Sequence, residues 1–150
     1  MLIHELTPAE CRNVLATVSV ARLACAHADQ PYIVPISFAF DPSSNGLFGF
    51  STMGKKIQWM RANPKVCLEV DEITDRFHWQ TVIVLGRYEE ISDVPQQAGE
   101  RQRMLNLLGT RAEWWFPGAA KFEGTQPHGV VIFRIHIESM TGRRADRNRS

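Results

Sequence analysis

The sequence is poor in cysteine: it has three in 150 residues, and no two of them form a C-x-x-C pair. Because Cys11, Cys25 and Cys67 are odd in number and far apart, neither a disulfide framework nor a zinc knuckle follows from them. The five histidines show no spacing typical of metal ligands, so we expect no metal site. The three thiols are therefore expected to be buried and inert.

Long hydrophobic runs are also missing. No apolar stretch approaches the ~20 residues that a helix needs to span a bilayer, so we expect no membrane segment. The first six residues lack the basic start and the apolar stretch of a signal peptide. The chain has no repeats, and its 150 residues suit one domain with its own core. We expect a soluble, cytoplasmic protein.

An excess of one charge is absent as well, since 17 Lys and Arg face 16 Asp and Glu, a formal net charge of +1. A protein that binds nucleic acid by neutralising phosphates would be more basic, so we expect no nucleic-acid partner. The basic cluster of Arg143, Arg144, Arg147 and Arg149 lies at the C-terminal end. We predict a folded domain over residues 1–142 and a disordered basic tail over residues 143–150.

What the sequence does contain is a series of β-type segments. Runs rich in β-branched and aromatic residues, or alternating apolar and polar, predict six strands over residues 18–26, 32–40, 47–51, 65–71, 79–91 and 130–138. Helices are predicted after the capping box of Thr7 and Glu10, over 55–62 and over 95–108. These elements predict a mainly β fold with short helices, a small closed antiparallel barrel.

Two of the predicted strands have an unusual feature. Pro35 cannot donate a ladder hydrogen bond, so it marks an edge strand, a bulge, or a place where strand pairing stops. Residues 82–85, Val-Ile-Val-Leu, are apolar on both faces. Such a strand is covered on both sides, by the barrel interior on one side and by a helix or another subunit on the other.

The segment from Gly49 to Ile57 runs from a strand through a glycine-containing loop into a helix. Free N–H groups at a helix start attract anions, and Ser51 and Thr52 add hydroxyl donors. Lys55 and Lys56 fall in the first turn, where a cation opposes the helix dipole. Two interpretations stay open: a bound phosphate neutralises the lysines, or both are solvated and a cost of a few tenths of a kcal/mol is tolerated.

Four motifs in order carry a family resemblance: PYIVPISF (31–38), FSTMGKKI (50–57), NPKVCLEV (63–70) and WQTV to GRYEEI (79–91). Together they resemble the pyridoxamine 5'-phosphate oxidase-like FMN-binding split barrels, and within them the nitroimidazole-resistance-type branch. The resemblance extends from about residue 6 to residue 143. It implies a six-stranded antiparallel split β-barrel of the FMN-binding type, present as a homodimer with two FMN sites at the subunit interface.

The resemblance also implies a set of cofactor contacts. Lys56, with Lys55 beside it, would pair with the FMN phosphate, and hydroxyls would donate to it. The backbone of the 31–38 motif would border the isoalloxazine ring, and the 79–91 strand would approach the flavin. The hydroxyls are those of Ser51 and Thr52. The backbone beside the ring is that of Pro35, Ile36 and Ser37. The residues of the 79–91 strand that approach the flavin are Trp79, Gln80 and Thr81.

The chain departs from the family in two ways that bear on its reaction. Phe50 stands where nitroimidazole-resistance-type members often carry a histidine, so nitro-group reduction by that route is not implied. No counterpart exists of the C-terminal Trp and Arg with which pyridoxamine-phosphate oxidases hold their substrate, so vitamin B6 oxidation is not expected. The aromatic patch of Trp114, Trp115 and Phe116 is expected to plug the barrel or lie at the dimer interface rather than to recognise a substrate.

The leading functional hypothesis is an FMN-dependent oxidoreductase that transfers hydride or electrons from a reduced nicotinamide to an unknown small-molecule acceptor. No side chain stands out as a general acid or base, so no catalytic residue is assigned. One alternative is a non-catalytic flavin-binding or sensing module. Another is the same barrel with the deazaflavin F420 or haem in place of FMN.

Overall fold

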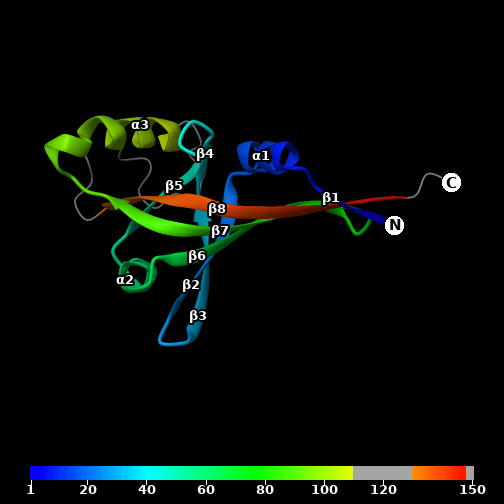
Figure 1. Cartoon of the computed structure of the whole chain (residues 1–150), viewed down its shortest axis with the longest axis horizontal. Helices are drawn as coiled ribbons and strands as arrows, with labels where there is room; N and C mark the ends of the chain where they lie inside the picture. Colours follow the sequence, from blue (N-terminus) through cyan, green and yellow to red (C-terminus); the bar gives the residue numbers. More distant parts are fainter. Residues whose placement is uncertain (110–129, 148–150) are drawn as a thin grey trace.

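The computed structural model describes residues 1–109 and 130–147 (Figure 1). Its strands and helices follow in the order β1 (Leu2–Glu5), α1 (Pro8–Thr17), β2 (Val20–His27), β3 (Gln30–Ser37), β4 (Ala39–Asp41), β5 (Gly46–Thr52), α2 (Lys55–Ala62), β6 (Lys65–Asp75), β7 (His78–Ile91), a short 3-10 turn η1 (Pro95–Gln97), α3 (Ala98–Gly109) and β8 (Val130–Asp146). The aromatic patch 114–116 lies outside the described residues.

All strand pairings that the structure describes are antiparallel, in the order β3-β2-β6-β7-β8-β5-β4, with β1 paired to β8. The predicted mainly β, antiparallel split-barrel fold is thus confirmed. Each of the six predicted strands is present with shifted ends, but the predicted strand 32–40 is divided at residue 38 into β3 and β4, and the short strand β1 is additional. Pro35 lies on β3, the last strand in the sheet order, and pairs with Arg22 of β2. Its missing N–H is tolerated because an edge strand needs donors on one side only.

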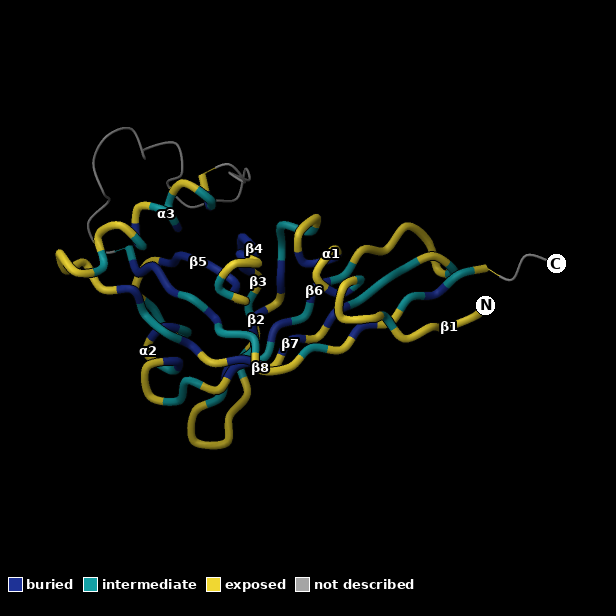
Figure 2. Tube along the Cα trace, turned by 45° about the horizontal axis from the view of Figure 1, so that its top comes forward, coloured by how far each residue is buried: buried dark blue, intermediate teal, exposed yellow. Residues whose placement is uncertain are grey.

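The buried hydrophobic side chains of the described residues form two clusters, and Figure 2 shows the buried stretches of the chain in dark blue. The larger fills the barrel and includes Leu23, Leu68 and Val84. The smaller lies beneath α3, where Phe50 packs with Met104. Phe50 therefore faces α3, on the opposite side of β5 from Ser51, because successive side chains of a strand point to opposite faces.

The long strands β7 and β8 continue beyond the barrel, with β1 alongside, toward the two chain ends (Figure 1). Residues 143–146, for which we expected a disordered tail, lie in β8. Arg143 pairs with Glu5 of β1 and with Thr81 of β7. Pairing on both sides satisfies the backbone of this segment, which composition alone does not reveal. The predicted domain end at residue 142 therefore falls inside a strand.

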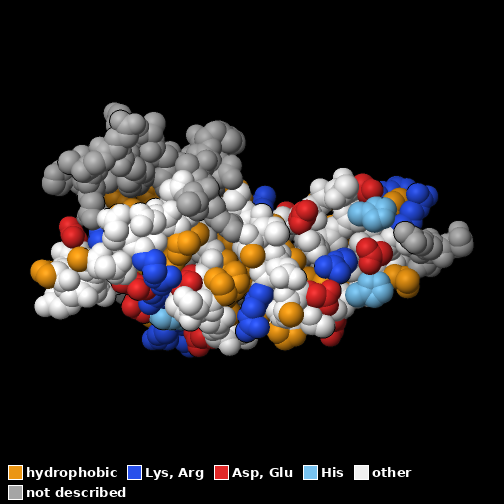
Figure 3. Space-filling model, turned by 90° about the horizontal axis from the view of Figure 1, so that it is seen from above, with side chains coloured by type: hydrophobic (Ala, Val, Ile, Leu, Met, Phe, Trp, Pro, Cys, Tyr) orange, Lys and Arg blue, Asp and Glu red, His pale blue; other side chains and the backbone are white. Residues whose placement is uncertain are grey.

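Charged side chains of both signs lie intermixed on the face in Figure 3, in keeping with the net charge of +1. Among the described residues, no helix is long and apolar enough to cross a membrane. In the same part of the chain, no group of three or more His, Cys, Asp or Glu side chains is arranged to hold a metal ion.

Candidate flavin phosphate site

The start of α2 is open to an anion. The N-cap residue is Gly54, and among the described residues no side chain makes a capping hydrogen bond there. The first turn contains Lys55 and Lys56 and no acidic residue. The first turn of α2 therefore combines N–H groups that lack a side-chain cap with two cationic residues, directly after β5 ends at Thr52.

Lys56 is the residue whose environment is most informative. It is half-buried, and the loss of water around its ammonium lowers its pKa below the usual value, although the nearby Cys25 thiol acts in the opposite direction. Within residues 1–109 and 130–147, no carboxylate forms an ion pair with either lysine of α2. A half-buried ammonium without a counter-charge is costly, and a bound phosphate would supply that charge.

Lys55 is more exposed and lies over two aromatic rings. Its Nζ is 4.8 Å from the ring centroid of Tyr32 and 4.7 Å from that of Trp59. Trp59 also lies 5.6 Å, centroid to centroid, from the ring of His27. The amide Nδ2 of Asn63 donates to the carbonyl oxygen of Ala26 at 3.1 Å, which fastens α2 to the β2–β3 hairpin.

The other predicted phosphate and ring contacts lie on strands near α2. Ser51 is buried, and its hydroxyl donates to the carbonyl oxygen of Thr52 at 2.8 Å. On β3, the Ile36 side chain lies in the barrel core. Pro35 is exposed on the opposite face, and the buried Ser37 hydroxyl donates to the carbonyl oxygen of Ser19 at 3.5 Å.

The predicted contacts on β7 lie at the far end of the sheet. Lys65, which follows α2 closely, pairs with Arg87, whereas Trp79 lies eight residues before Arg87, near the start of β7. At a rise of about 3.3 Å per residue, this separation is about 26 Å. Within one chain, the structure therefore brings the β3, β5 and α2 residues together and leaves Trp79, Gln80 and Thr81 apart from them.

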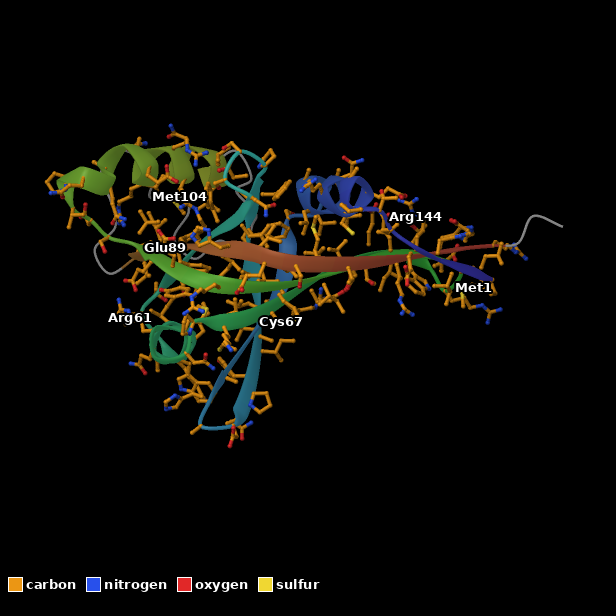
Figure 4. All side chains as sticks on the ribbon, viewed as in Figure 1. Met1, Arg61, Cys67, Glu89, Met104 and Arg144 are labelled. Carbon is orange, nitrogen blue, oxygen red and sulfur yellow. The ribbon has the colours of Figure 1, made fainter. Side chains whose placement is uncertain are left out.

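Gln80 also points to a different side from its neighbours. Alternation places it on the face of buried Val82, and its amide nitrogen donates to Glu72 Oε2 at 2.9 Å. Its carbonyl oxygen accepts from the Arg144 guanidinium at 3.0 and 3.2 Å (Arg144 is labelled to the right of α1 in Figure 4). Trp79 and Thr81 instead share the face of Ile83, an exposed apolar residue.

A groove of about 560 Å³ on that same outer face was not foreseen from the sequence. Small residues of β2 and β7, Ala24, Ala26 and Gly86, form part of its wall together with Cys67 and Leu85. None of its described lining residues belongs to the ten predicted contacts. The signal in the sequence was the apolar run 82–85: Ile83 and Leu85 are 44% and 52% exposed in the single chain, whereas Val82 and Val84 are buried.

Three of the histidines lie beside carboxylates. His78 lies 2.9 Å from Asp75, and His136 pairs with Glu89. The Nε2 atom of His4 is 3.6 Å from Asp146. His78, adjacent to Trp79, is thus tied to the turn between β6 and β7, as expected of a polar residue at a strand end.

The chain matches the family model of pyridoxamine 5'-phosphate oxidase over residues 7–144. It is therefore a member of the pyridoxamine 5'-phosphate oxidase family, as the four motifs indicated. An uncharacterized protein of Rhizobium meliloti (strain 1021) is 40% identical, and the match covers 97% of each chain.

Two solved structures add to this. A FAD-binding protein from Mesorhizobium loti is 40% identical, with a TM-score of 0.82, and the match covers 97% of this chain and 100% of that one. A candidate 5-nitroimidazole antibiotic resistance protein from Bacteroides thetaiotaomicron is 16% identical, with a TM-score of 0.68, and the match covers 98% of this chain and 93% of that one. The second likeness shows the fold alone.

Proposed function

We propose that this protein binds a flavin whose phosphate lies at the start of α2, paired with Lys56 and Lys55 and hydrogen-bonded by Ser51 and Thr52. The observation that carries the proposal is the half-buried Lys56 ammonium, which has no carboxylate partner in the described part of the chain. Its position next to the uncapped helix start suits a phosphate dianion. Family membership supports a flavin as the molecule that carries this phosphate.

FMN is the flavin we propose, as the sequence resemblance implies. FAD is a second candidate because the Mesorhizobium loti protein, 40% identical over nearly the whole chain, is described as FAD-binding. Both contain the phosphate next to the ribityl chain, so the lysines do not separate them. F420 would use the same contacts, whereas haem would leave the two lysines without a role.

We further propose that the flavin site is completed by a second copy of the chain. Within one chain, Trp79 lies about 26 Å and Thr81 about 20 Å along β7 from the level of Lys65, just after α2, too far to meet one flavin ring. They lie on the sheet face where Ile83 and Leu85 are exposed. Burial of that apolar face in a homodimer would place one copy's Trp79 and Thr81 against its partner's α2 end.

The reaction that we propose is transfer of hydride or electrons from a reduced nicotinamide to a small-molecule acceptor, with the flavin supplying the redox chemistry. The residues of this chain would bind the phosphate, orient the ring and exclude water. Its alternative is a flavin-binding or sensing role without turnover. Phe50 does not distinguish them, because its side chain packs beneath α3.

The experiment is to purify the protein, record its visible spectrum with and without added FMN or FAD, and identify the released chromophore by chromatography. A two-band flavin spectrum supports the proposal, and FMN or FAD in the released fraction decides between them. Anaerobic addition of NADH or NADPH then separates an oxidoreductase, whose flavin bleaches and reoxidises with turnover, from a binding module. A colourless protein that binds neither FMN nor FAD, or a protein with a haem Soret band, would overturn the phosphate assignment.

A further inference from the structure

The two aromatic rings that contact Lys55, those of Tyr32 and Trp59, have no part in the proposed flavin contacts. Tyr32 and Trp59 lie 5.6 Å apart, centroid to centroid, with an interplanar angle of 59°. The Lys55 ammonium lies within 4.8 Å of both ring centroids. Distances below about 6 Å place it in the range of an attractive cation–π contact with each ring.

The rings are held in place from two elements. Trp59 follows Lys55 by four positions on α2, so the two side chains lie on one face of the helix. Tyr32 comes from β3, opposite Cys25 of β2. Both rings are partly buried and pack against the barrel core, so their own positions are fixed by tertiary contacts.

This arrangement constrains a side chain that is otherwise free to move. An exposed lysine loses rotamer entropy when it binds an anion, and a contact that orders it beforehand reduces that loss. Lys56 is constrained by burial, whereas Lys55 is exposed and is constrained by the two rings.

We propose that Tyr32 and Trp59 are positioning residues, which hold the Lys55 ammonium beside the open start of α2 so that it contacts a flavin phosphate together with Lys56. The proposal rests on the proposed function. The two lysine side chains are thus ordered before phosphate binds by different physical means, Lys56 by burial and Lys55 by cation–π contact. Loss of a ring should weaken phosphate binding through Lys55, with no direct contact between ring and phosphate.

The test is a double-mutant cycle on the flavin-free protein. FMN is titrated by the quenching of its fluorescence into the wild type, Trp59→Leu, Lys55→Met and the double variant. Riboflavin, which lacks the phosphate, is titrated in parallel. Tyr32→Phe is the matched control because it keeps the ring and removes only the hydroxyl, and thermal melting of each flavin-free variant reports on folding.

The proposal predicts that Trp59→Leu weakens FMN binding about two- to fivefold in the presence of Lys55 and has no effect in the Lys55→Met chain. Riboflavin affinity and the Tyr32→Phe variant should stay at the wild-type level. Equal weakening in both backgrounds, equal loss for riboflavin, or tighter FMN binding after Trp59→Leu would each overturn it.

Two outcomes are kept apart by this design. Where Trp59→Leu fails to fold, Tyr32→Leu replaces it in the same cycle, since both rings lie at nearly equal distances from the ammonium. A wild type that binds FMN without coupling between ring and Lys55 removes the positioning role only. A wild type that binds neither FMN nor FAD refutes the proposed function as well.

Discussion

Replacement of Lys56 by methionine is the most direct test of the proposed phosphate site. Methionine keeps much of the length and apolar character of the side chain and removes the ammonium. Because Lys56 is half-buried, the apolar methionine side chain can occupy the space now filled by the aliphatic part of the lysine. The variant therefore isolates the charge, which an alanine substitution would combine with a loss of packing.

Two effects of opposite sign are expected. A charge-assisted hydrogen bond to phosphate is worth roughly 1.5–3 kcal/mol, so flavin affinity should fall about ten- to a hundredfold. The flavin-free protein should be at least as stable as the wild type, because burial disfavours the Lys56 ammonium, as its lowered pKa shows. A residue that only maintained the fold would lower stability and affinity together.

The assay combines FMN titration with urea unfolding of the flavin-free protein. Arg12→Met is the control, since it removes a positive charge from an exposed residue of α1, outside the proposed site and interface. Its FMN affinity should change by much less than that of Lys56→Met. The reasoning would be refuted by wild-type FMN affinity in Lys56→Met, or by an equal loss in Arg12→Met.

Further predictions concern packing, assembly and pH. A Cβ at Gly86 would lie 2.5 Å from the backbone oxygen of His136, so Gly86→Ala should cost about 1–3 kcal/mol in urea unfolding. Gly54→Ala, whose Cβ would have no atom of the described residues within 4 Å, should cost far less. Leu85→Glu should yield monomers in light scattering and lose flavin, whereas a dimer that retains flavin would contradict the proposed interface. Burial raises the pKa of the Asp41 carboxyl, but hydrogen bonds from the Arg103 guanidinium and the hydroxyls of Ser44 and Ser43 together outweigh this effect and hold that pKa far below its usual value. Its stabilisation is therefore present above pH ~3.8 and lost as pH falls further, so the deficit of Asp41→Asn, about 2–3 kcal/mol at neutral pH, should shrink in acid unfolding.

Much of the fold could be predicted because it depends on local patterns. Alternation of apolar and polar residues identified β6, and the capping box of Thr7 and Glu10 placed α1, where both of its hydrogen bonds form. Strand ends were less accurate. β8 continues to Asp146 because β1 and β7 pair with it on both sides, and such long-range pairing leaves little trace in the sequence of the paired segment itself.

The candidate site was predictable in part for the same reason. Ser51, Thr52, Lys55 and Lys56 are neighbours in the sequence and stay neighbours in space, so their relation to the start of α2 follows from the chain alone. The link between Lys55 and Tyr32 joins residues of two elements and was not predicted. Nor was the orientation of Gln80, which is set by Glu72 and Arg144 across the sheet.

Residue type and short-range order were enough to predict the mainly β class, the position of the lysine pair at a helix start and the family. Three features instead required the folded chain: the half-burial of Lys56 with no carboxylate partner among the described residues, the position of Lys55 over two rings, and the distance of Trp79 from both lysines within one chain. Burial and counter-charges depend on which distant segments pack together. That packing is a property of the whole fold.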